Sequence, residues 1–106
     1  LRWETLLLDK KKTWRAHQAA LDKKKLKSQL IIRKYQKGAY FYPTKMNGKK
    51  LLSKFFKDEK YTTLEKESQW LLCSGEDIVW VIGKRCDRRF IPKKTYSEIL
   101  LMQLEI

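Results

Sequence analysis

The apolar residues of the chain fall in short runs, most of which have the spacing of β-strands. In the opening run, Trp3, Thr5 and Leu7 share one face, which is typical of a strand with one buried side. The run Ile78–Ile82 is apolar throughout, so it predicts a strand at the centre of a sheet. A turn at residues 74–77 predicts that this strand forms a hairpin with the preceding one. The predicted strands span residues 1–9, 14–21, 29–35, 70–73, 78–82 and 98–106.

One segment, residues 49–60, has the spacing of a helix instead. Its apolar side chains fall within an arc of about 140° when successive residues turn by about 100°. These side chains are Leu51, Leu52, Phe55 and Phe56. The lysines on the opposite side are Lys50, Lys54 and Lys57. We therefore expect a helix with one packed face and one basic face, capped at its start by Asn47 or Gly48.

A second, shorter helix is predicted over residues 63–68, because Thr62 followed by Glu65 forms a capping-box pattern. Strands outnumber helices and do not alternate with them regularly. We therefore expect an α+β fold, with a small, mostly antiparallel or mixed sheet of about six strands, one main helix and one short helix. The length of 106 residues corresponds to a single domain.

Positive charge is concentrated in the first part of the chain. Residues 1–60 contain 18 basic and 5 acidic side chains, whereas residues 61–106 contain 7 of each. The whole net charge of +13 therefore belongs to the first segment. Such a field favours a polyanionic partner, with nucleic acid first and an anionic membrane surface second. A lysine-rich surface that serves only solubility is the alternative.

The residues that catalysis or metal binding would need are sparse. The closest two of the four glycines are eight residues apart, so neither common type of phosphate-binding glycine loop is present. Cys73 and Cys86 do not have zinc-ligand spacing, and His17 is the only histidine. We expect free, buried thiols in a reducing cytoplasm, no metal, no cofactor and no membrane span. The pattern therefore predicts a binding or accessory domain without a catalytic site of its own.

Basic side chains and aromatic rings are interleaved over residues 33–60. The basic residues are Arg33, Lys34, Lys37, Lys45, Lys49, Lys50, Lys54, Lys57 and Lys60. Lysine suits phosphate better than base edges, so a duplex RNA backbone is a better match than single-stranded bases. Phe41 and Tyr35 are expected in the core, whereas Tyr40 and Tyr42 fit a core position and base stacking equally well.

An ordered set of short motifs resembles the C-terminal domain of bacterial tRNA(Ile)-lysidine synthetases. The motifs are Arg33–Gly38, Phe41–Pro43, Met46–Leu51, Phe55–Asp58, Trp70–Leu72, Gly75–Val81, Gly83–Arg85, and Asp87 with Arg89 and Phe90. The resemblance implies a C-terminal tRNA-binding domain at 21–106 and a connection from a preceding domain at 1–20. It also implies that the chain is a cytoplasmic fragment of a longer enzyme.

The resemblance implies a function for that parent enzyme. Enzymes of this family use ATP to join lysine to the wobble cytidine of a minor isoleucine tRNA. ATP and Mg would bind the parent's N-terminal catalytic domain, and the C-terminal domain is associated with the tRNA body and acceptor stem. Arg33, Lys49, Lys50 and Arg85 match basic positions of the family and become the preferred RNA contacts.

The chain departs from the family pattern at four motif positions. It has Ala39 and Lys54 where the family usually has Asp, Lys45 where it usually has Gly, and Ile82 where Pro is common. The two lost acids make the surface more basic. They leave in doubt any polar network that those acids would anchor.

Two other functions remain open from the sequence. The domain could pack on the parent's catalytic domain or mediate a homodimer, through Ile78–Ile82 and the aromatic residues 40–42. It could also belong to a different RNA-processing enzyme with the same accessory fold, because fold does not fix function.

Overall fold

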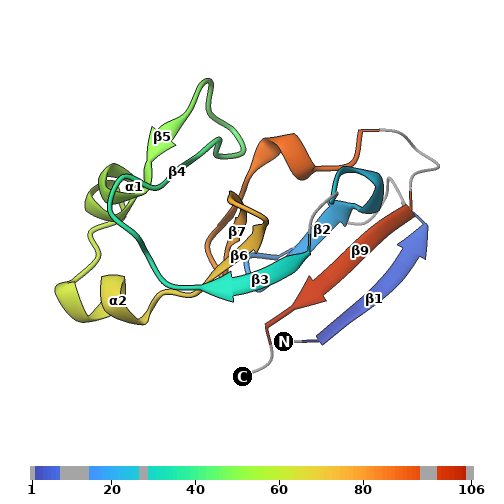
Figure 1. Cartoon of the computed structure of the whole chain (residues 1–106), viewed down its shortest axis with the longest axis horizontal. Coiled ribbons are helices and arrows are strands. Elements are labelled where there is room, and N and C mark those ends of the chain that lie inside the picture. Colours follow the sequence, from blue (N-terminus) through green and yellow to red (C-terminus); the bar gives the residue numbers. More distant parts are fainter. Residues whose placement is uncertain (1, 8–14, 27–28, 94–97, 105–106) are drawn as a thin grey trace.

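The described part of the chain folds into three antiparallel sheets and two short α-helices (Figure 1). The computed structural model describes residues 2–7, 15–26, 29–93 and 98–104. The strands are β1 (Arg2–Leu7), β2 (Gln18–Asp22), β3 (Leu30–Arg33), β4 (Tyr40–Phe41), β5 (Lys50–Leu51), β6 (Leu71–Ser74), β7 (Asp77–Val81), β8 (Arg85–Cys86) and β9 (Glu98–Gln103). The helices are α1 (Leu52–Asp58), α2 (Thr63–Ser68), and the 3₁₀ turns Lys23–Lys25 and Arg88–Phe90. The α+β expectation is confirmed.

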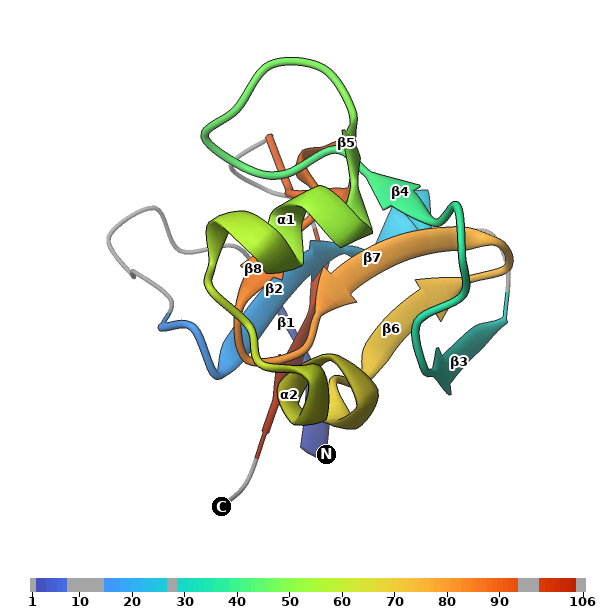
Figure 2. The same ribbon diagram turned by 90° about the vertical axis from the view of Figure 1, so that its left-hand side faces the viewer.

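The β6–β7 hairpin lies in the middle of the fold, between α1 and the sheet of β1, β9 and β2 (Figure 2). It carries apolar side chains on both of its faces. On one face, Leu72 and Trp80 pack with Leu21 of β2 and Met102 of β9. On the other face, a second cluster joins β6 and β7 to β4 and α1. That cluster comprises Phe41, Leu52, Phe55, Phe56, Leu71, Cys73, Ile78 and Val81. Because β7 lies between β6 and β8 and is covered on both sides, its uninterrupted apolar run is explained and its predicted central position is confirmed.

A three-stranded sheet joins the two ends of the sequence. Strand β9 lies between β1 and β2, with Gln103 opposite Arg2 on one side and Gln18 on the other. The Gln18 side-chain amide donates to that of Gln103 at 2.6 Å. The strand predicted at 14–21 begins only at Gln18, and residue 14 lies outside the described residues. The strands predicted at 1–9 and 98–106 correspond to β1 and β9, and their predicted ends at 8–9 and 105–106 also lie outside the described residues.

Helix α1 begins three residues later than the periodicity predicts. Lys50 and Leu51 form β5 and pair with β4, and the Leu52 N–H donates to the Ala39 carbonyl at 2.9 Å. Leu51 is therefore the N-cap, without a side-chain capping bond, and it is exposed. The predicted caps Asn47 and Gly48 were wrong. Backbone pairing with a distant strand decides the start of this helix.

The predicted capping box of α2 is confirmed. The Glu65 N–H donates to the Thr62 hydroxyl at 3.1 Å, and the Thr62 N–H donates to the Glu65 carboxylate at 2.9 Å. This signal is local in sequence, so no long-range contact overrides it.

The turn regions differ from their predicted form. The β6–β7 connection is two residues, Gly75 and Glu76, rather than four, and the ladder shifts register between Leu72 and Cys73. The predicted loop at 84–89 contains β8, which pairs with β7, followed by a 3₁₀ turn. These short elements bring the arginines of this region under the β4–β5 loop.

Candidate nucleic-acid interface

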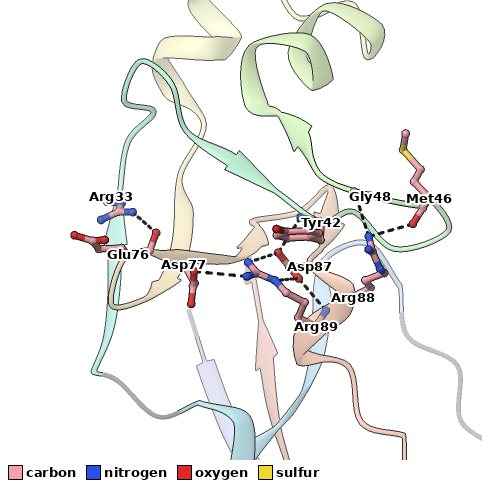
Figure 3. A network of polar contacts seen from close by, with 9 residues as sticks. All are labelled: Arg33, Tyr42, Met46, Gly48, Glu76, Asp77, Asp87, Arg88 and Arg89. Atoms are coloured by element: carbon pink, nitrogen blue, oxygen red, sulfur yellow. Dashed lines mark hydrogen bonds and ion pairs between the residues drawn. The ribbon is translucent and has the colours of Figure 1, made fainter.

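A buried carboxylate, Asp87, joins the segment after β4 to the segment after β8 (Figure 3). Its Oδ2 accepts from the Tyr42 N–H and from Arg89 Nη2, each at 2.9 Å. Its Oδ1 accepts from the Arg89 N–H at 2.8 Å and from Arg89 Nε at 3.1 Å. The hydrogen bond to Asp87 raises the pKa of Arg89 above its usual value. The buried charge is therefore fully compensated, and the two segments are held together.

Two arginines hold the β4–β5 loop from the inside (Figure 3). The guanidinium carbons of Arg89 and Arg88 lie 4.1 and 5.2 Å from the ring centroid of Tyr42. Arg88 Nη1 also donates to the carbonyls of Met46 and Gly48, at 3.2 and 2.9 Å. These contacts anchor the backbone of the loop that carries Lys45 and Lys49.

The loop presents two exposed lysines, Lys45 and Lys49, and Lys49 lies beside an exposed aromatic ring. The Lys49 ammonium lies 4.6 Å from the ring centroid of Tyr40, which is 45% exposed. Tyr40 in turn meets Tyr42 edge-on, with centroids 6.2 Å apart. Lys45 has a φ of 65°, a left-handed conformation that usually favours glycine. The loop thus combines positive charge with a ring that is accessible to solvent.

Helix α1 contributes two further exposed lysines, Lys54 and Lys57. Lys50 lies before the helix, half-buried, and forms an ion pair with Asp58. The hydrogen bond and charge of Lys50, with smaller effects of Lys57 and Lys54, lower the pKa of Asp58. The predicted helical row of three lysines is therefore reduced to two.

The candidate residues near β3 are more strongly engaged in the fold. Arg33 Nη2 donates to the Glu76 carbonyl at 2.9 Å, and the Lys34 ammonium lies 3.9 Å from the Trp70 ring centroid. Arg33 and Lys37 line one hollow together with Tyr40. Of these three basic residues, only Lys37 is exposed.

A separate groove brings together four basic residues, two of which the sequence did not single out. Lys45 and Arg85 were candidates, whereas Arg15 and Lys84 were not. Arg85 donates to the Thr44 carbonyl at 3.2 Å and lies 3.9 Å from Glu59. Lys84 lies within the motif Gly83–Arg85, but that motif does not indicate that it faces Arg15. Only the packing of β2 beside β8 places the two residues on one rim.

The two cysteines are free, and burial raises the pKa of both thiols, that of Cys86 to about 12. Both are therefore protonated and weakly nucleophilic at neutral pH. Within the described part of the chain, no group of three or more His, Cys, Asp or Glu is placed to hold a metal ion. None of the described helices is long and apolar enough to cross a membrane.

Comparison with known proteins shows the family to which the chain belongs. The sequence pattern of the family described as "TilS substrate C-terminal domain" matches residues 30–100. The chain belongs to the TilS C-terminal domain family. A tRNA(Ile)-lysidine synthase of Parabacteroides distasonis is 44% identical over 84 residues, which are 79% of this chain and 19% of the relative. One from Bacteroides thetaiotaomicron is 40% identical over 86 residues, 81% of this chain and 20% of the relative.

A solved structure described as a TilS C-terminal domain supports the fold. It superposes with a TM-score of 0.82 at 18% identity, covering 95% of this chain and 78% of that one. The chain spans about a fifth of the length of the curated relatives it matches. The predicted resemblance to the TilS C-terminal domain is therefore confirmed.

Proposed function

We propose that this TilS C-terminal domain binds tRNA for an ATP-dependent ligase, which joins lysine to the wobble cytidine of a minor isoleucine tRNA. The named relatives are tRNA(Ile)-lysidine synthases, which supports tRNA as the partner. In this proposal, the parent's catalytic domain performs the reaction with ATP and Mg. The domain described above holds the RNA, with the acceptor stem as the duplex it contacts.

The observation that carries this proposal is a set of exposed lysines on the β4–β5 loop, α1 and the segment before β4. The set comprises Lys37, Lys45, Lys49, Lys54 and Lys57. None of them forms an ion pair with another residue that the structure describes. Their charges are therefore available to phosphates, whereas Lys50 and Arg85 each have an acidic neighbour.

Electrostatic binding of this kind predicts a strong dependence on salt. If these lysines neutralise about five phosphates, log K should fall with log salt at a slope of about −4, by analogy with duplex DNA. Removing Lys54 and Lys57 together, as Lys54→Gln with Lys57→Gln, should reduce the slope by about two. Melting should be unchanged, because both side chains are solvated.

The test measures binding of the fragment to a minor isoleucine tRNA, to a hairpin of its acceptor stem and to an unrelated tRNA, at several salt concentrations. A charge-matched control replaces Lys24 and Lys66 by Gln, since both are exposed and lie outside the proposed set. A slope near zero would refute phosphate binding. A control pair that reduces the slope as much as the α1 pair would refute the proposed location.

Domain packing is a second candidate function, favoured by exposed apolar side chains on and beside the edge strand β3. Ile31, Ile32 and Trp70 are 39%, 46% and 48% exposed. The run Ile78–Ile82, suggested by the sequence as the contact, cannot serve because β7 is buried in the core. Size-exclusion chromatography over a range of concentrations tests for a homodimer. A concentration-dependent shift that Ile32→Lys removes would support this contact.

A further inference from the structure

We propose that the groove between β2 and β8 binds one unpaired nucleotide of an RNA strand. This inference rests on the proposed tRNA-binding function and adds a site to it. Its lining comes from β2 and the residues just before it, from the β7–β8 hairpin, and from the segments at residues 44–45 and 91–92.

The size and lining of the groove suit a base and its sugar. Its volume is about 540 Å³, within the range of about 300–1,000 Å³ that small-molecule sites occupy. Ala20, Trp80 and Cys86 contribute apolar atoms at its inner side, and Ile91 and Pro92 lie at its half-exposed side. An apolar hollow accepts a projecting base, whereas the flank of a duplex offers only its ribose-phosphate surface.

The charge of the groove suits the attached phosphates. Arg15, Lys45, Lys84 and Arg85 are its four charged lining residues, and no described carboxylate lines it. Arg15, Lys45 and Lys84 are exposed, while Arg85 is fixed by its hydrogen bond to the Thr44 carbonyl. A cationic rim around an apolar floor matches a nucleotide, which is charged on one side and flat and apolar on the other.

The walls of the groove are set by the fold rather than by mobile side chains. The Thr44 N–H donates to the Cys86 carbonyl at 3.1 Å, and the Lys84 N–H donates to the Val81 carbonyl at 2.8 Å. Trp80 is opposite Cys86 in the β7–β8 pair. Such a preformed site loses little conformational entropy when it is filled.

The test compares two fluorescein-labelled RNA hairpins by anisotropy: one blunt, and one with a short single-stranded overhang. The wild-type chain should bind the overhang hairpin about tenfold more tightly, a gain typical of one bound base. Ala16→Phe, at an exposed lining position, should reduce this preference below about twofold, because the ring fills the mouth. Thr63→Phe, exposed on α2, is the matched control and should keep the preference.

A charge test complements the steric one. Arg15→Gln with Lys84→Gln should weaken overhang binding more than blunt binding, whereas the control Lys24→Gln with Lys66→Gln should change both little and to the same extent. If the wild-type chain binds the two hairpins equally and the salt dependence is intact, nucleotide binding in the groove is refuted, whereas the proposed function still stands. Salt-insensitive or absent binding of both hairpins would overturn the two together. A free mononucleotide that binds as tightly as the overhang would also overturn assignment to an RNA strand.

Discussion

Replacement of Asp87 by Asn should strongly destabilise this domain. The carboxylate is fully buried and accepts four hydrogen bonds, from the Tyr42 N–H and from three N–H groups of Arg89. Asn keeps the acceptor at Oδ1 and puts an NH₂ group in place of Oδ2. The bonds to the Tyr42 N–H and to Arg89 Nη2, both 2.9 Å long, are then lost.

The size of the effect follows from the kind of bonds that are lost. Both lost bonds end on the charged carboxylate, and a hydrogen bond to a charged group contributes about 1.5–3 kcal/mol. Their sum, about 3–6 kcal/mol, overlaps the range of about 3–5 kcal/mol for breaking a buried ion pair. A domain of this size has a total stability of about 5–15 kcal/mol, so the loss is a large fraction of it.

Urea unfolding followed by tryptophan fluorescence measures this loss, with Asp77→Asn as the matched control. Asp77 is the other carboxylate near Arg89, at 3.7 Å, but its side chain is 58% exposed. Its replacement should cost less than about 0.5 kcal/mol. If Asp87→Asn costs no more than Asp77→Asn at an unchanged m-value, the structural role assigned to the buried carboxylate is refuted.

Three further predictions concern other parts of the fold. Lys45→Gly should leave the free energy of unfolding unchanged or raise it by up to about 1 kcal/mol, because glycine relieves the left-handed φ of 65°; a loss in thermal melting would contradict this. Burial raises the pKa of Tyr61 to about 12, so the folded state keeps a proton that the unfolded state releases above about pH 10. Stability should therefore fall as pH rises from 10 to 12, and Tyr61→Phe should reduce that fall in urea titrations at each pH; an identical fall in the variant would count against the buried phenol as its cause. Thr62→Ala should cost about 1 kcal/mol through loss of the α2 cap, whereas Thr63→Ala should cost little, and chemical denaturation of both variants distinguishes the two.

The features that the sequence predicted correctly depend on nearby residues. The capping box of α2 involves Thr62 and Glu65, which are three positions apart, and the central position of β7 follows from its own apolar run. The start of α1 was misplaced because Leu51 pairs with Tyr40, eleven residues earlier. Periodicity within a helix carries no information on such a pairing.

The candidate interface also has features that the sequence predicts and features that depend on long-range contacts. Clusters of lysines are visible in the sequence, and Lys45, Lys49, Lys54 and Lys57 are exposed as surface lysines should be. Which cations are already engaged could not be predicted. The ion pair of Lys50 with Asp58 depends on where α1 begins, and the meeting of Arg15 with Lys84 depends on the packing of β2 beside β8.

The position of β9 between β1 and β2 has a consequence for biosynthesis. Gln18 and its partner Gln103 are 85 residues apart, so β1 and β2 leave the ribosome long before the strand that joins them. The ribosome adds about 5–20 residues per second, so these two strands wait seconds for their neighbour. The β6–β7 hairpin and α1 can assemble during that interval, whereas the three-stranded sheet can close only when β9 has emerged. A nascent chain halted before residue 98 should therefore expose unpaired strand edges and be especially dependent on chaperones.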